Sequence, residues 1–189
     1  MKKVAILLFF TSLVLMTSVS FSQSKVNTNT LVQYGDKMYK INDDKPYTGK
    51  VFDLHKSNGN KKMEGYYKDG LRYRRWNWWY EDGQKQKEGT FKNGKLDGLW
   101  TEWHENGQKG KEGTFKDGEL DGLWTEWYGD GQKGMEATFK NGKLDGLYTQ
   151  WHENGQKKSE VTYKDGKLDG LFTQWHENGQ KEKEATYKD

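Results

Sequence analysis

The chain of 189 residues has a net charge of only +3, and apolar residues make up 32% of it while aromatic residues make up 15%. Such a low apolar content is typical of disordered chains, but these are poor in aromatic residues, so folding must depend on rings. The absence of Cys excludes disulfides, thiolate metal sites and Cys nucleophiles. With so small a net charge, the sequence does not predict the strongly basic surface that binds nucleic acid.

The N-terminus has the pattern of a targeting segment. Two lysines, Lys2 and Lys3, precede an apolar run from Val4 to Met16, and Ser20-Phe21-Ser22 follows as a small-x-small pattern. The run is short for a membrane span, so residues 1–22 are predicted to be a secretory signal peptide. Cleavage after Ser20 and an uncleaved anchor are the alternatives. We therefore expect an exported protein, located in the periplasm, at the outer-membrane surface or outside the cell.

Residues 23–45 are expected to form an N-terminal capping hairpin. Its two strands are predicted at 31–34 and 37–41, around Gly35-Asp36. Arrays of repeats need such caps at their ends.

Residues 46–189 repeat with a period of 24. A fixed period of this length indicates a repeat architecture. The first copy fits with a slip: Phe52, His55 and Gly59 are in phase with later copies, but Gly49 is one residue early. Three aromatic rows define the phase: Trp76, Trp100, Trp124, Tyr148 and Phe172; Trp79, Trp103, Trp127, Trp151 and Trp175; and Tyr67, Phe91, Phe115, Phe139, Tyr163 and Tyr187.

Each copy is predicted to be a β-hairpin, because segments rich in Trp, Thr, Phe and Tyr alternate with turn residues. Asn106-Gly107 predicts a two-residue turn, and residues 116–122 link to the next copy. This register places Trp100 opposite Gly113 and Trp103 opposite Gly110. The Trp100 and Trp103 rows then lie on opposite faces. The fold class is all-β: an elongated, twisted antiparallel sheet of tandem 24-residue hairpins.

The motif Gly-x-Trp-x-x-Trp-x-x-Asn-Gly-Gln-Lys, followed by Glu-Gly-Thr-Phe-Lys-Asp-Gly, resembles the MORN repeat family in its bacterial exported variant. Similar repeats occur in antitoxins of the YwqK type. The resemblance covers residues 46–189, most securely 86–189, and implies an elongated sheet of hairpins. It also implies a scaffold that binds proteins or associates with membranes.

The sequence contains no catalytic motif. Its acidic residues recur at the same positions of each copy, so they do not form the unique constellation of groups that an active site needs. Neither a catalytic residue, a metal site nor a cofactor is therefore predicted. His104, His152 and His176 share one phase, but alternate strands are about 9.6 Å apart, so they are expected to be exposed histidines. Asp117 and Asp121 are expected to serve turns, since the loop lacks the ligand density of a calcium site.

Two features suggest binding. The Trp103 row forms an apolar stripe unless the sheet twist and the Leu96, Leu120, Leu144 and Leu168 linkers cover it. One copy is also unusual: Arg74 replaces Gly, and Trp78 replaces an acidic or amide residue. Arg and Trp dominate binding hot spots. The predicted binding residues are Arg74, Arg75, Trp76, Trp78, Trp79, Trp103, Trp127, Trp151 and Trp175.

The sequence thus predicts a non-enzymatic exported scaffold that binds a protein or cell-envelope component through an aromatic face, with membrane-surface contact as one form. An antitoxin or immunity protein and a module for envelope glycan or choline-like groups are the alternatives. Returning positions 74, 75 and 78 to the residues of the other copies is expected to leave stability equal or higher.

Overall fold

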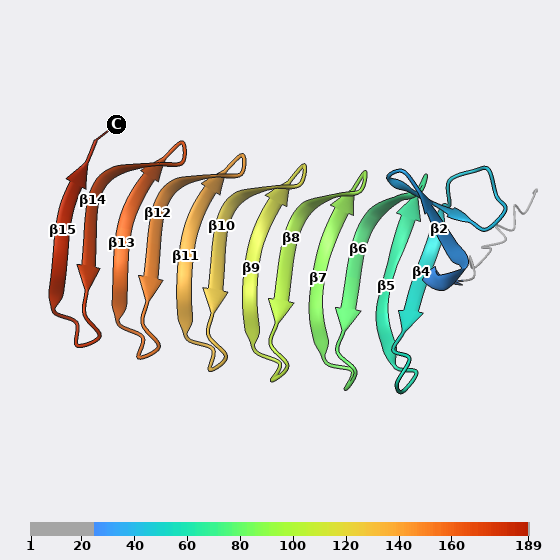
Figure 1. Cartoon of the computed structure of the whole chain (residues 1–189), viewed down its shortest axis with the longest axis horizontal. Helices are drawn as coiled ribbons and strands as arrows, with labels where there is room; N and C mark the ends of the chain where they lie inside the picture. Colours follow the sequence, from blue (N-terminus) through green and yellow to red (C-terminus); the bar gives the residue numbers. More distant parts are fainter. Residues whose placement is uncertain (1–24, 189) are drawn as a thin grey trace, which may run out of the picture.

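A computed structural model describes residues 25–188, so the predicted signal peptide at 1–22 lies outside the described residues. One elongated antiparallel sheet dominates this part of the chain, with a small hairpin at its N-terminal end (Figure 1). The only helical turn in residues 25–188 is the 3-10 turn η1, Thr28–Thr30. The predicted all-β fold is confirmed.

Thirteen strands of the described residues form the main sheet, in the order β1-β4-β5 and then consecutively to β15. Apart from the parallel pair β1·β4, all of these neighbours are antiparallel. The strands of the sheet are β1 Val26–Asn27, β4 Gly49–Leu54, β5 Lys61–Lys68, β6 Leu71–Trp79, β7 Lys85–Lys92, β8 Lys95–Trp103, β9 Lys109–Lys116, β10 Glu119–Trp127, β11 Lys133–Lys140, β12 Lys143–Trp151, β13 Lys157–Lys164, β14 Lys167–Trp175 and β15 Lys181–Tyr187.

One turn of each copy is a two-residue hairpin. Between β9 and β10, Asp117 has φ 50° and Gly118 has φ 91°, and Lys116 pairs with Glu119. Positive φ at both central residues is the type I′ geometry, which suits Asn-Gly and Asp-Gly. Plain turn chemistry therefore explains Asp117, as expected.

The other turn is longer than predicted. Between β8 and β9 the loop is closed by His104, whose N–H donates to the Gln108 carbonyl at 2.9 Å, while Gly107 N–H donates to the His104 carbonyl at 2.9 Å. Three residues, 105–107, thus form the loop, with only Gly107 at positive φ (82°). This is a type I turn followed by a left-handed glycine. The prediction of a two-residue turn at Asn106-Gly107 is therefore wrong.

The predicted register nevertheless holds for most of the hairpin. Trp100 pairs with Gly113, as expected, and Glu102 pairs with Lys111. Trp103 pairs with Lys109 and not with Gly110, because Gly110 is the extra residue of a bulge. The extra residue of the bulge compensates for the extra residue of the loop, so from Glu102 toward Trp100 the pairs are the predicted ones.

Large rings of the Trp76 row lie on small residues of the neighbouring strand. A Cβ added at Gly89 would lie 2.4 Å from Trp100, and one at Gly113 would lie 2.4 Å from Trp124. Where the ring is smaller the facing residue is larger: Tyr148 pairs with Ala137, and Phe172 pairs with Val161. Ring and facing residue thus compensate in size along the core.

The N-terminal end holds the best-buried core. Hairpin strands β2 Leu31–Tyr34 and β3 Lys37–Lys40 lie where they were expected, and Met38 N–H donates to the Gly70 carbonyl at 3.0 Å. Val51 and Trp76 are completely buried beside Leu31. The hairpin thus covers one end of the aromatic core, consisting of Leu31, Tyr47, Val51, Tyr67, Trp76 and Phe91.

The slip in the first copy lies in the turn after His55 and not between Gly49 and Phe52, as was predicted. Val51, not Phe52, pairs with Gly65, and so takes the place of Trp76. The turn that follows holds one more residue, since His55 N–H donates to the Asn60 carbonyl. Hence His55 corresponds to Tyr80 and not to Trp79, and only Gly59 keeps the predicted phase.

Candidate binding surface

The sheet has one core face and one outer face. The core face carries the Trp76 row, with Leu96 and Trp100 packed against the N-terminal core. Leu120 lies on the same side, 3.4 Å from a Cβ built at Gly113. The linker leucines therefore cover the Trp100 row, and the prediction that they cover the Trp103 row is wrong.

On the outer face, a lysine of the preceding hairpin lies over each ring of the Trp103 row. Lys85 Nζ is 5.2 Å from the Trp103 ring centroid and Lys109 Nζ is 5.8 Å from that of Trp127. Each lysine also pairs with a glutamate, as Lys109 does with Glu112 at 2.6 Å. These Trp rings are half-buried rather than an open apolar stripe. The same arrangement recurs at Trp79, Trp151 and Trp175.

The most exposed apolar residues of this face form a row that the sequence analysis did not single out. Leu99 lies two residues before the buried Thr101 on β8, so alternation places both on the outer face. Its side chain is 51% exposed, and its counterparts are similar. Large residues in strands are usually taken as core, but here the Trp rings already fill that role. The exposed row, called the leucine row below, is Leu99, Leu123, Leu147 and Leu171.

Basic residues continue the leucine row at its N-terminal end. Leu99 pairs with Thr114, and in the two preceding hairpins Arg75 pairs with Thr90 and Lys50 with Tyr66. The six positions therefore read Lys50, Arg75, Leu99, Leu123, Leu147 and Leu171.

Arg74 is held in an unusual backbone conformation. Its φ is 64°, whereas the glycine at the same position of the next copy, Gly98, has φ 123°. Non-glycine residues rarely adopt positive φ, and such strain is often found at functional sites. Its guanidinium carbon lies 5.6 Å from the ring centroid of Tyr66 and 5.5 Å from that of Tyr73.

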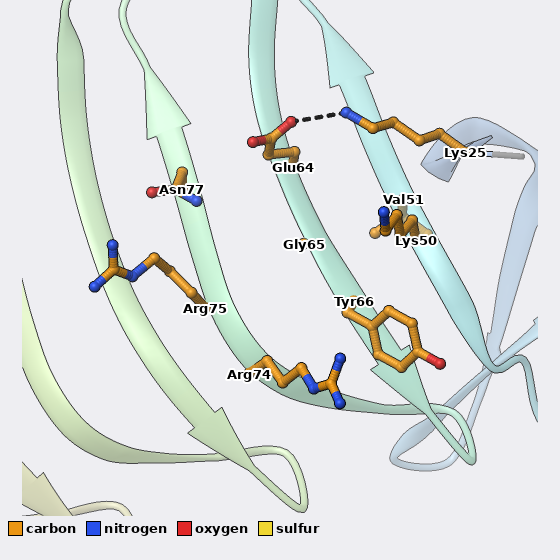
Figure 2. Close-up of a pocket in the computed structure, with 9 residues that line it drawn as sticks. All are labelled: Lys25, Lys50, Val51, Glu64, Gly65, Tyr66, Arg74, Arg75 and Asn77. Carbon is orange, nitrogen blue, oxygen red and sulfur yellow. Dashed lines mark hydrogen bonds and ion pairs between the residues drawn. The ribbon is translucent and has the colours of Figure 1, made fainter. Parts of the chain in front are cut away.

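A pocket of about 270 Å³ lies at this basic end, between β4, β5 and β6 (Figure 2). Burial raises the pKa of the Glu64 carboxyl, but hydrogen bonds from Lys25 and Lys61 outweigh this effect and lower that pKa below its ordinary value. Within residues 25–188, no ion pair involves Lys50, Arg74 or Arg75. The residues that carry its chemistry, called the basic pocket below, are Lys50, Glu64, Tyr66, Arg74, Arg75 and Asn77.

Trp76 and Trp78 belong to the core and not to the basic pocket. Trp76 is completely buried, so it cannot contact a partner in the folded protein. Trp78 stacks on Trp76 with centroids 5.9 Å apart and also approaches Trp100 at 5.9 Å. Arg72, which was not predicted, lies 4.9 Å from the Trp76 ring centroid. The structure thus separates the predicted cluster into a core part and an outer part.

The histidines of the repeat are not simply exposed, as had been expected. The Nε2 atom of His104 donates to the Trp127 carbonyl at 3.1 Å, and that of His152 donates to the Trp175 carbonyl at 3.0 Å. His176 alone among the three is exposed. In the part of the chain described, no group of three or more potential metal-binding side chains was found.

The family model for the MORN repeat variant matches five consecutive segments: residues 75–93, 96–117, 120–141, 144–165 and 168–189. Together these cover more than half of the chain. The chain belongs to the MORN repeat variant family. The suspected family is therefore confirmed, and the matched MORN segments begin after the slipped first copy. In the comparison with curated proteins, none matches this chain.

The MORN array is a scaffold of nearly identical hairpins, on which the basic pocket and the core cluster are local departures. Across residues 25–188 there is no helix long and apolar enough to cross a membrane.

Proposed function

We propose that this MORN protein is an exported, non-enzymatic scaffold that binds a protein partner through its outer face. The observation that carries the proposal is the leucine row, in which four leucines are each about half exposed at one position of successive hairpins. Contiguous exposed apolar surface on a soluble protein commonly marks an interaction site. The half-buried rings of the Trp103 row lie on the same face and would enlarge the contact.

Regular spacing supports an extended contact. Equivalent strands lie two apart, or about 9.6 Å, so the leucine row presents one apolar side chain at each such step. A lysine–glutamate pair within one strand of each hairpin reduces the net charge beside the row, as in the contact of Lys133 with Glu136 at 2.5 Å. A face that presents an apolar side chain at each regular step suits contact with a long protein surface.

Replacing all four leucines by Ser tests the proposal. Capture from an envelope extract of the native host is expected to fall at least about tenfold, since each buried leucine contributes on the order of 1.5–3 kcal/mol. A matched control replaces Tyr34 and Ile41, which are 71% and 57% exposed on and beside the N-terminal hairpin. Equal capture by wild type and the leucine variant would overturn the proposal.

Export is tested separately. Mass spectrometry of the protein from its native host is expected to find an N-terminus at Gln23 or Phe21. An intact Met1 in a cytosolic fraction would contradict export.

A further inference from the structure

Four departures from the repeat meet at one place on the outer face. Lys50 and Arg75 stand where other copies have Leu, Tyr66 stands where they have Thr, and Arg74 stands where they have Gly. Each one alone could be neutral variation. Together they convert an apolar and small surface into a basic one with an aromatic support.

The positive charge of this place is uncompensated. Lys50, Arg74 and Arg75 make no ion pair within residues 25–188, and Arg74 and Arg75 are exposed. The acidic group that faces them, Glu64, is already paired with Lys25 and Lys61, each at 3.1 Å. An anionic ligand would therefore meet cations whose charge no protein carboxylate satisfies.

Arg74 is prepared for such contact. Its guanidinium lies over the rings of Tyr66 and Tyr73, a contact that uses the face of the group and leaves its N–H donors for a ligand. A non-glycine residue at φ 64° lowers the stability of the fold, and the later copies avoid this backbone strain by having Gly at the same position. A ligand contact gives a reason for retaining the strained residue.

The arrangement favours several carboxylates over one phosphate. Figure 2 shows Arg74 extending from β6 toward Tyr66 on β5, whereas Arg75 extends to the opposite side of β6, toward β7. Lys50 projects from β4. Cations that diverge over three strands match separate acidic groups along a segment better than one compact anion.

The charge distribution also favours a protein over a membrane. Beyond the first two hairpins, the lysines that lie over the rings of the Trp103 row are paired with glutamates, as in Lys109–Glu112 at 2.6 Å and Lys133–Glu136 at 2.5 Å. A flat anionic membrane would be attracted by a basic face along the whole array. Here basic residues take the positions of the leucine row only at one end, at Lys50 and Arg75.

We propose that the basic pocket binds two or more carboxylates from an acidic segment of the protein partner. Lys50, Arg74 and Arg75 donate charge-assisted hydrogen bonds to these carboxylates. The Tyr66 hydroxyl and the Asn77 amide add neutral donors. The proposal deepens the proposed function, on which it rests for the nature of the partner, and it sets the direction in which that partner lies along the leucine row.

The test is calorimetric titration of the purified protein with hexaglutamate, with hexaglutamine as the uncharged peptide control. Wild type is expected to bind hexaglutamate in a salt-dependent manner. The variant Arg74→Gly/Arg75→Leu restores the residues of the other copies and is expected to bind at least about tenfold more weakly. The control Lys92→Gln/Lys116→Gln removes the same charge from exposed positions away from the pocket and is expected to change affinity less than about twofold.

Equal weakening in both variants would overturn the proposal, because diffuse charge and not the pocket would then bind the peptide. Absence of hexaglutamate binding would also overturn it, and binding of phosphatidylglycerol vesicles in that case would assign the surface to an anionic membrane. Since the leucine-row experiment uses different residues and a different readout, the pocket can fail while capture through the leucine row still holds.

Discussion

The Nε2 atom of His104 lies 3.1 Å from the carbonyl oxygen of Trp127, one hairpin further along the chain. In the next copy the Tyr128 hydroxyl makes the same tie to the Trp151 carbonyl at 2.7 Å. Two chemically different rings thus serve one purpose, which is to place a donor on the carbonyl at the end of the neighbouring strand. The row of histidines and tyrosines is therefore structural.

From this tie we expect His104→Tyr to leave the free energy of unfolding unchanged within about 0.5 kcal/mol. His104→Phe keeps a ring of similar shape but has no donor, so it is expected to lose about 0.5–1.5 kcal/mol. Urea denaturation measures both values. The control is His176→Phe, because His176 is exposed and should show no loss. Equal effects at His104 and His176 would contradict the tie.

Arg74 permits a test of backbone strain. Arg74→Gly removes the strain of φ 64° together with the stacking on Tyr66, so the two effects should nearly cancel. Arg74→Ala removes the stacking but keeps the strain. We expect the Ala variant to be less stable than the Gly variant by about 1 kcal/mol. Identical urea midpoints for the two variants would show that position 74 is not strained.

The packing of Trp78 opposes the expectation that returning position 78 to the residue of the other copies leaves stability equal or higher. Because Trp78 packs on Trp76 and Trp100, Trp78→Glu is expected to lower the free energy of unfolding by about 2–4 kcal/mol. The equivalent change in a later copy, Gln150→Glu, should have an effect below about 0.5 kcal/mol. A stability equal to or above that of wild type would restore the original expectation for Trp78.

The period of the sequence predicted the fold class and most strand pairs, because turn glycines and aromatic rings recur at every copy. It did not predict which of two glycine-containing turns would be the two-residue one. Asn106-Gly107 and Asp117-Gly118 carry equally good local signals, and the difference arises from the bulge at Gly110. A longer loop and a bulge that compensate for each other cannot be predicted from the alternation of residues, because alternation counts residues from one assumed turn.

The candidate surface was predicted only in part. Arg74 and Arg75 were found because they break the repeat, and the same break wrongly included Trp76, which is completely buried. Leu99 and Lys50 were missed for different reasons. Whether a leucine is buried depends on its packing and cannot be read from its identity. The extra residue in the turn at 56–59 shifts the first copy by one position, and this concealed that Lys50 and Arg75 occupy one row.

Deleting residues 142–165 removes one period and joins Asn141 to Gly166, which recreates an Asn-Gly turn. Each hairpin contacts its neighbours through the same ties, such as Gly118 N–H to the Leu96 carbonyl and Gly142 N–H to the Leu120 carbonyl. In arrays with such nearest-neighbour contacts, stability is approximately a sum over repeats. The shortened protein should keep a strand-type far-UV spectrum and unfold cooperatively. A deletion of 12 residues, half a period, is the control and should not fold.

The size compensation between Gly113 and Trp124 can be tested by exchanging it for the Val161–Phe172 pair found two copies later. Gly113→Val alone places its Cβ about 2.4 Å from Trp124, so a loss of about 1–3 kcal/mol is expected. Trp124→Phe alone leaves unfilled space and should also destabilise. The double variant recreates a pair that the protein already uses, so it should be more stable than the sum of the single changes by about 1–2 kcal/mol. Combining Gly113→Val with Tyr148→Phe, which are not in contact, should be additive within about 0.5 kcal/mol. Additivity in the Gly113–Trp124 cycle as well would show that ring and facing residue do not pack as a matched pair.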